Sequence, residues 1–339
     1  MKKKKNFLVV VLVLAIALTT MAHQSSCRGT ETAVSPTGDS VCADDSKPAY
    51  EQDSEGSAEV KSDAKAETRT DAKAILNITY QKADSLKVES LLSEAKKRDT
   101  TTNFMLFFAR KLLGIPYVGH TLEVNAEEQL VVNLRQLDCT TYVETVCALT
   151  LCAKHGQTAF TDYCHWLGQL RYRGGQLTDY TSRLHYFTDW IEDNTRMGFV
   201  KETQQKTAPF NAMQTVKVGF MTEHPQYYDM LKDNQQFQNI IAQQEKALNG
   251  RLYRYIVKTD ISNTPAMRQA VADGDIIAIL TNKKGLDTSH VGIAVWHADG
   301  LHLLNASQIH KKTVEEPMTL RQYMGKHPTQ TGIRVVKLL

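Results

Sequence analysis

The sequence has few cysteines, little net charge and a single long hydrophobic run. Its 339 residues include six cysteines and carry a formal net charge of +3. Neither a Cys-x-x-Cys pair nor a His-Glu-x-x-His pattern occurs, so we expect no zinc or other metal. A charge this small argues against a nucleic-acid-binding face, and one hydrophobic run excludes a multi-span membrane protein.

The composition is that of an ordinary globular protein. Hydrophobic residues make up 42% of the chain and charged residues 23%. These fractions exclude a collagen-like, coiled-coil or wholly disordered chain. The length suits two domains, or one large domain with appended segments.

The first residues have the pattern of an export signal. Lys2 to Lys5 form a basic start, and an apolar run follows from Phe7 to Leu18. This run is too short for a membrane-spanning helix and suits the core of a signal peptide. We therefore expect residues 1–26 to direct export, to the periplasm or the outer membrane of a bacterium.

Two cleavage sites stay open at the end of this signal. Cleavage after Ala22 fits the preference of a general signal peptidase for small residues. Cleavage before Cys27, which follows Ser25 and Ser26, would make a lipoprotein attached to a membrane through the lipidated Cys27. Gln24 is a poor residue for that second motif.

Residues 27–73 have the composition of a disordered linker. Within 28–73, acidic residues outnumber basic ones by 11 to 6, and Tyr50 is the single aromatic residue. Such a segment buries too little apolar surface to offset the entropy lost on ordering. We expect it to tether the folded part, residues 74–339.

The folded part begins with helices and ends with strands. Capping residues and apolar periodicity predict helices, at 84–98, 104–113, 139–153, 226–248 and 320–326. Apolar runs bounded by turn residues predict strands, at 130–134, 213–221, 252–259, 275–280, 289–295, 301–307 and 333–338. This order is typical of an α+β fold with an antiparallel sheet.

Cys139 is the candidate nucleophile. Asp138 is a good helix N-cap, and the helix that follows is apolar on nearly every side, as in a buried helix. A thiol at a helix N-terminus lies at the positive end of the helix dipole, which favours the reactive thiolate. Cys147 and Cys152 lie deeper in the same helix, and we expect them to be inert buried side chains.

His290 and Asn305 are the candidate partners of this cysteine. A nucleophilic cysteine needs a base, and the base needs a group that orients it. If the strands holding His290 and Asn305 pair across Gly300, both side chains come to the same end of the hairpin. The order Cys, His, Asn follows the logic of papain-like enzymes.

Several segments resemble one family of cell-wall hydrolases. DCTTYVE (138–144), GDII (274–277), SHVGIAV (289–295) and LLNAS (303–307) resemble the NlpC-type hydrolases, a papain-like superfamily. The sequence is more similar still to a subfamily of bacterial N-acetylmuramoyl-L-alanine amidases. That similarity lies in two further segments, GIPYVGHTLE (114–123) and RYRGGQLTDYTSRLHYFTDW (171–190).

This resemblance, which covers roughly residues 100–339, implies a fold and a chemistry. It implies an NlpC-type, papain-like core in which the helix of Cys139 packs on an antiparallel sheet. Helical additions would precede this core and interrupt it at about 157–270. Cys139 would be the nucleophile, His290 the base and acid, and Asn305 the orienting residue, a position where many members have histidine.

The resemblance also implies a substrate and residues that contact it. The substrates would be peptidoglycan fragments (muropeptides), cleaved without a cofactor between N-acetylmuramic acid and L-alanine. Arginines suit the carboxylates of stem peptides, and aromatic faces suit sugar rings. The residues expected to line the site or contact substrate are Tyr117, Asp138, Arg171, Arg173, Arg183, His185 and Trp190. Tyr117 would help to stabilise the oxyanion, and Asp138 would cap the helix.

Three other functions stay open. A γ-D-glutamyl-diamino acid endopeptidase would need a pocket for a free L-alanine amine, with Asp138 as its anchor. A non-catalytic peptidoglycan-binding lipoprotein would not need Cys139, His290 and Asn305 together. Acyl transfer to a lipid would use the same three residues.

Overall fold

The computed structural model describes residues 78–339, and Cys27, the predicted signal and the predicted linker lie outside these residues. The described helices are α2 Lys82–Ala95, α3 Phe104–Lys111, α4 Cys139–Lys154, α5 Phe160–Arg171, α6 Phe187–Arg196, α7 Phe220–Glu223, α8 Gln235–Leu248, α9 Pro265–Ala270 and α10 Leu320–Gly325. The described strands are β1 Ile78–Thr79, β2 Leu130–Val131, β3 Val200–Glu202, β4 Ala212–Thr215, β5 Leu252–Val257, β6 Ile276–Thr281, β7 Thr288–Trp296, β8 Leu301–Ser307, β9 Lys312–Glu315 and β10 Gln330–Leu338.

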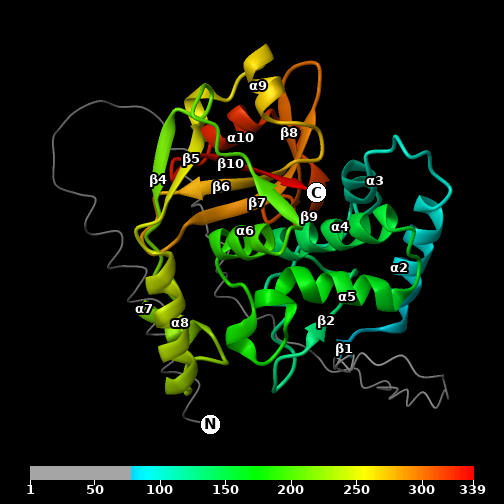
Figure 1. The fold of residues 1–339 in the computed structure, drawn as a ribbon, viewed down its shortest axis with the longest axis vertical. Coiled ribbons are helices and arrows are strands. Elements are labelled where there is room, and N and C mark those ends of the chain that lie inside the picture. Colours follow the sequence, from blue (N-terminus) through cyan, green and yellow to red (C-terminus); the bar gives the residue numbers. More distant parts are fainter. Residues whose placement is uncertain (1–77) are drawn as a thin grey trace, which may run out of the picture. The chain divides into compact units, whose positions relative to one another are not determined.

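An antiparallel sheet forms the centre of the described part (Figure 1). Seven of its eight strands follow the order β4-β5-β10-β6-β7-β8-β9, and β3 pairs with β10. The predicted hairpin of β7 and β8 is confirmed, with Ile293 opposite Leu304 and Trp296 opposite Leu301. Helices combined with an antiparallel sheet agree with the mixed class that the sequence predicts.

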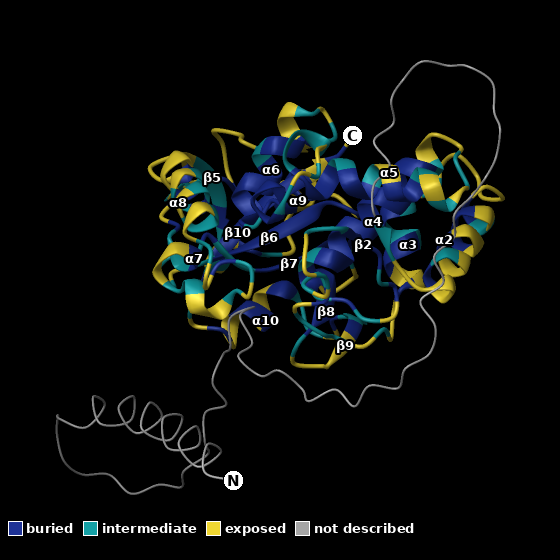
Figure 2. Ribbon diagram, turned by 90° about the horizontal axis from the view of Figure 1, so that it is seen from below, coloured by how far each residue is buried: buried dark blue, intermediate teal, exposed yellow. Residues whose placement is uncertain are grey.

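Both faces of the sheet are covered by apolar side chains. Along β6, Ile276 and Ala278 pack into the core shared with α2 to α6, whereas Ile277 and Ile279 pack into the core shared with α9 and α10. This alternation follows from the two-residue repeat of a strand. Figure 2 shows the sheet and α4 as buried, with exposed residues on the outer sides of α2 and α8.

The predicted helix after Asp138 is confirmed as α4. Nearly all of its side chains are buried, and it packs against both β7 and β8. Burial on every side explains why its sequence has no polar face. The helix therefore holds its first residue, Cys139, against the hairpin that carries His290 and Asn305.

Both elements predicted within 213–248 are shorter in the structure than expected. The strand predicted over 213–221 ends at Thr215. The helix predicted over 226–248 begins at Gln235, because the Asn234 side chain accepts from the Phe237 N–H at 3.0 Å and caps it there. Alternating apolar residues and helical periodicity extend into this connection, where the structure has only the short helix α7 and no continuation of either predicted element.

The stretch 157–270, expected as an insertion, contributes to both layers of the fold. Helices α5 and α6 pack in the same core as α4, and β5 pairs with β10. A third cluster of buried side chains joins α7 and α8 to the segment before α6. Among the described residues, no helix is both long enough and apolar enough to span a membrane.

Candidate active site

Cys139 is the first residue of α4. The Asp138 carboxylate accepts from the Thr141 N–H at 2.8 Å, and the Thr141 hydroxyl oxygen accepts from the Asp138 N–H at 2.9 Å. These reciprocal bonds fix the helix start, so the sulfur of Cys139 lies at the positive end of the dipole. The residue is 4% exposed. The described cysteines, Cys139, Cys147, Cys152 and Cys164, are buried thiols outside any disulfide.

His290 and Asn305 meet at one end of the β7–β8 hairpin. The imidazole Nε2 of His290 donates to the Asn305 side-chain oxygen over 3.0 Å, and both residues are buried. The Asn305 amide nitrogen points to the Leu303 carbonyl at 3.4 Å, which orients the amide oxygen toward the imidazole. With Nε2 held by Asn305, Nδ1 is the nitrogen available to the thiol.

The thiol of Cys139 and the imidazole of His290 are hydrogen bonded. Burial alone would lower the pKa of His290, because it disfavours the charged ring. The charge and hydrogen bond of Cys139, with the hydrogen bond of Asn305 and the charge of Glu316, outweigh burial and raise this pKa. A raised histidine pKa favours an imidazolium beside a thiolate, the reactive form of such a pair.

Asp138 lies beside this pair, and the pKa of its carboxyl group is raised. Burial is the largest cause, and the charge of Cys139 adds to it, so the pKa of Asp138 rises to about 6 despite the hydrogen bonds from Thr141. The carboxylate is therefore partly protonated near neutral pH. By contrast, burial raises the pKa of Cys147, further along α4, so that this thiol stays protonated.

A cavity of about 250 Å³ opens onto Cys139 and His290. Tyr117, Asp138, Arg183 and His185, all predicted from the sequence, also line it. The Tyr117 N–H donates to the Lys311 carbonyl at 3.0 Å, which holds this loop beside the turn after β8. The cavity has room for a small group beside the sulfur, as a substrate site requires.

Arg183 and His185 line the cavity, and each also makes polar contacts within the protein. Arg183 pairs with Glu123 at 3.1 Å and lies over the Tyr180 ring at 4.8 Å. His185 contacts the Tyr180 carbonyl through Nε2 at 2.9 Å. Burial and then the charge of Arg183 lower the pKa of His185 to about 3, so its ring is neutral and a weak base.

The other predicted contact residues lie deeper or elsewhere. Arg171 borders the cavity, but its guanidinium forms a buried ion pair with Glu144 at 2.7 Å and also donates to the Val131 carbonyl. Arg173 pairs with Asp189 and does not line the cavity. Trp190 is fully buried in the helix-side core. The structure therefore does not bring Arg173 or Trp190 to the site.

Several cavity residues were not singled out from the sequence. They line the cavity from α4, from the segments before α4 and α6, from α7 and the residues after it, and from the connection between β6 and β7. They include Glu123, Glu144, Tyr180, Tyr186, Phe220, Tyr228 and Asp287. Glu123 ends the recognised segment 114–123, so a signal for it existed. Tyr228 and Phe220 lie in the stretch 213–248, where the sequence offers no motif.

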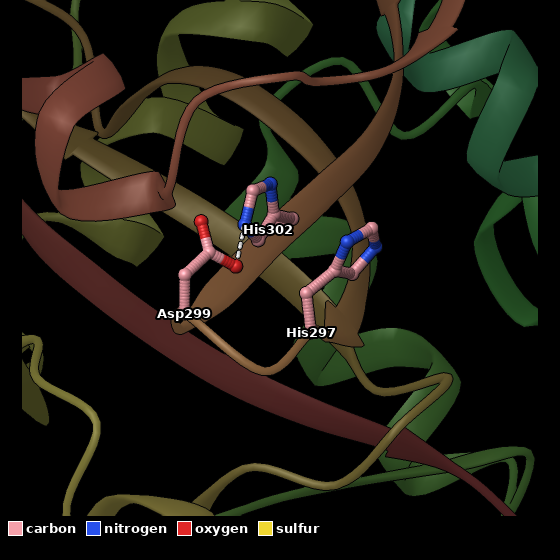
Figure 3. A group of neighbouring side chains, drawn as sticks. All are labelled: His297, Asp299 and His302. Carbon is pink, nitrogen blue, oxygen red and sulfur yellow. Dashed lines mark hydrogen bonds and ion pairs between the residues drawn. The ribbon is translucent and has the colours of Figure 1, made fainter.

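One group of side chains in the described residues has a composition suited to a metal ion. His297, Asp299 and His302 lie at the turn between β7 and β8 (Figure 3). None of them lines the cavity of Cys139. Any metal bound there would therefore lie outside the candidate active site.

The family described as AmiA-like, N-acetylmuramoyl-L-alanine amidase-like, matches residues 107–333. The chain belongs to this family. The matched range of this chain includes Cys139, His290 and Asn305. Comparison with curated proteins found no match.

Solved structures similar to this AmiA-like chain include an N-acetylmuramoyl-L-alanine amidase from Bacteroides uniformis. It is 35% identical with a TM-score of 0.65, and the match covers 73% of this chain and 99% of that chain. A Bacteroides fragilis protein provisionally named a xylanase is 36% identical with a TM-score of 0.63, covering 68% and 99%. A protein from Legionella pneumophila, 21% identical with a TM-score of 0.57 over 76% and 94%, shares the fold.

Proposed function

We propose that this AmiA-like protein is a cysteine-dependent N-acetylmuramoyl-L-alanine amidase that acts on muropeptides. The observation that carries the proposal is the position of His290 between Cys139 and Asn305 at the wall of a cavity. The similar Bacteroides uniformis protein is named for the same activity. The papain-like, NlpC-type core is part of this proposal, since a helix-start cysteine facing a strand histidine is its defining arrangement.

The reaction would proceed through a thioester. The Cys139 sulfur, having given its proton to His290, attacks the carbonyl carbon of the lactyl–alanine amide. His290 then donates that proton to the leaving amine of L-alanine, and the C–N bond breaks. Water, deprotonated by His290, attacks the thioester, and the released thiolate regains the proton. The products are the sugar acid and the intact stem peptide.

The oxyanion formed during attack would be stabilised at the start of α4. The backbone N–H of Cys139 belongs to the first turn, whose N–H groups have no partner within the helix. Such donors lower the barrier when they point at the developing charge. Tyr117, which lines the same cavity, is the second donor in this proposal.

Arg183 is the proposed contact for a stem-peptide carboxylate. It lines the cavity, and burial lowers its pKa less than Glu128 and other neighbours raise it, so its charge persists. Glu123 already accepts one of its hydrogen bonds. A substrate carboxylate would therefore share Arg183 with Glu123, which predicts a modest contribution to affinity.

The endopeptidase alternative is favoured by one specific feature, the carboxylate of Asp138. Both of the Asp138 bonds from Thr141 reach Oδ1, from the N–H at 2.8 Å and from the hydroxyl at 2.9 Å. Oδ2 is then the oxygen that could meet a free L-alanine amine in the cavity. Identification of the reaction products separates this alternative from the amidase.

Glycoside cleavage, suggested by the provisional name of the Bacteroides fragilis protein, fits the cavity less well. It needs a carboxylic acid and a second carboxylate on opposite sides of the bond. Glu123 and Glu144 are paired with arginines, and Asp287 accepts from the Thr188 N–H at 2.6 Å. These carboxylates hold the cavity walls together, which leaves cysteine chemistry as the better explanation.

Product analysis tests the proposal. The purified full chain and its Cys139→Ala variant would be incubated with defined muropeptides, and the products separated by mass spectrometry. Cys147→Ala is the matched control, because it removes a fully buried thiol from the same helix away from the cavity.

The outcomes separate the candidate functions. An intact stem peptide and free sugar, released by the wild type and by Cys147→Ala but not by Cys139→Ala, support the amidase. A dipeptide of L-alanine and D-glutamate would make the protein an endopeptidase instead. Substrate binding without any product would show a binding protein without catalytic activity.

Export and lipidation are proposed from the sequence. Residues 1–26 would direct export, and a lipidated Cys27 would attach the protein to a membrane. Mass spectrometry of the mature N-terminus tests both ideas. A first residue of His23 would exclude the lipoprotein, and an acylated Cys27 would support it.

A further inference from the structure

The turn between β7 and β8 brings together two histidines and an aspartate that do not line the cavity proposed for amide cleavage. We propose that His297, Asp299 and His302 bind a divalent transition-metal ion, with Zn²⁺ the first ion to test. One donor atom from each of the three residues lies within 4.8 Å of the others. Two imidazoles and one carboxylate are donors that zinc and its neighbours in the periodic table prefer.

The donor spacing is close to what a tetrahedral ion requires. Zinc bonds to nitrogen and oxygen place neighbouring donors roughly 3.3 Å apart. His302 Nε2 and Asp299 Oδ1 are already 3.0 Å apart. The side chain of His302 is 4% exposed and fixed, whereas those of His297 and Asp299 are 40% and 64% exposed. The two exposed side chains can therefore close around an ion held by His302.

Each histidine also has an acceptor for its second ring nitrogen. His302 Nδ1 lies 2.8 Å from the Glu316 carbonyl, and His297 Nε2 lies 2.7 Å from a Glu315 carboxylate oxygen. Metal-binding histidines almost always donate their other ring N–H to a carbonyl or carboxylate in this way. The arrangement leaves Nε2 of His302 and Nδ1 of His297 as the nitrogens available to an ion.

The backbone of the turn is held before any ion arrives. The His297 N–H donates to the Gly300 carbonyl at 2.9 Å. The carbonyls of His297 and Ala298 accept from Arg268 and Asn263, each at 3.0 Å. Ligands on a rigid turn lose little conformational entropy when they bind.

A simple ion pair explains less of this geometry. A bond between Asp299 and His302 would tie the turn without any help from His297. Yet the His297 ring lies 4.2 Å from the His302 ring, and Glu315, itself held by Arg110, orients it. A metal site explains the positions of all three residues, because two oriented imidazoles and a carboxylate would then bind one ion.

Zinc binding to the full chain tests the proposal. The protein would be treated with a chelator, freed of it, and titrated with Zn²⁺ by calorimetry in a Cys139→Ala background, which removes the thiol as a competing ligand. We expect one ion per chain, with the dissociation constant raised at least tenfold by His297→Ala and by Asp299→Ala. His165→Ala removes an exposed histidine on α5 and is the matched control, with affinity unchanged.

Thermal unfolding gives a second measurement that does not depend on activity. Zn²⁺ should raise the unfolding midpoint of the Cys139→Ala protein and of its His165→Ala control, because binding stabilises the folded state. It should raise the midpoint of the His297→Ala and Asp299→Ala variants much less. Equal affinity in all variants, or no binding by the parent protein, would overturn the proposal. The site does not depend on the proposed amidase activity, so either proposal can fail alone.

Discussion

The two ends of the β7–β8 hairpin carry histidines in opposite environments. At one end His290 is buried, hydrogen bonded to Asn305 and placed against the thiol of Cys139. At the other end the His297 side chain is 40% exposed and contacts the Glu315 carboxylate. The same residue type on one hairpin is therefore proposed to transfer protons where it is buried beside a thiol. Where it is exposed beside carboxylates, it is proposed to bind a cation.

Removing the histidine at each end is the strongest test of this difference. We expect His290→Ala to lower kcat/KM by about 10³-fold or more, because the thiol then lacks a base. His297→Ala should leave kcat/KM within about twofold, since it does not line the cavity. Turnover of muropeptides by the two variants is the measurement. Similar losses from both would show that the two ends are not distinct.

A substitution of Asn305 tests what sets the pKa of His290 at the buried end of the hairpin. The Asn305 hydrogen bond helps to raise the pKa of His290, so Asn305→Ala should lower that pKa and shift the alkaline limb of the kcat/KM profile to lower pH. We also expect a loss of kcat/KM of about 10²-fold, at the lower end for a positioned proton transfer. A merely structural role would lower activity without moving the limb. Asn305→His should recover much of the activity, because a ring nitrogen can also accept the bond.

A substitution of Gly292 tests how closely β7 and β8 pack between the two ends of the hairpin. An added Cβ would lie 2.7 Å from Leu303 Cγ and 2.8 Å from the Leu304 carbonyl oxygen. Gly292→Ala should therefore destabilise the fold by about 1–3 kcal/mol, as overpacking does. Urea unfolding measures this, with Gly325→Ala as the control because nothing lies within 4 Å of its added Cβ. Equal unfolding free energies for both variants would refute the close approach.

A substitution of Asp138, at the start of α4 beside the buried end of the hairpin, is expected to have the smallest effect, a change in stability that depends on pH. The Asp138 pKa of about 6 lies above the ordinary value of 3.8, so the folded state disfavours the ionised carboxylate. Stability from this group is therefore greatest at acidic pH and falls as pH rises from about 4 through 6. Asp138→Asn keeps a good N-cap and should be more stable than the wild type at pH 8 by about 1 kcal/mol.

The same Asp138→Asn variant has two informative outcomes besides this one. A difference in unfolding free energy that does not vary with pH would contradict the raised pKa. A large loss of muropeptide turnover would favour the endopeptidase, because only that reaction needs the carboxylate to hold an amine.

The helices α2, α3, α4 and α10 and the central strands were predictable because their signals are local. Asp138 caps α4 through a residue three positions away, and β6, β7 and β8 follow from short apolar runs bounded by turns. The predictions for the connection from β4 to α8 were wrong, because its alternating apolar residues Val216 and Val218 pack in a core cluster with α7 and α8 instead of extending β4. The short strand β9 was missed for the opposite reason, because its four residues carry almost no pattern.

In the candidate site, too, the residues with local signals were predictable and those that depend on tertiary contacts were not. Cys139, His290 and Asn305 were recognisable because each lies in a short motif within an element whose ends could be placed. The partners of the arginines were not recognisable. Arg171 forms an ion pair with Glu144 from a neighbouring helix, and Arg183 forms one with Glu123 from a distant loop, so each guanidinium already has a carboxylate partner within the protein.

The sequence by itself determined the class of fold, the helix that begins at Cys139 and the hairpin that carries its two partners. Caps, turns and apolar periodicity act over a few residues and survive any arrangement of the rest. Only the tertiary structure decided which side chains reach the cavity, why Trp190 lies in the core, and how His297, Asp299 and His302 come together. Burial and ion pairing depend on segments far apart in the chain, and no local pattern records which of them will meet.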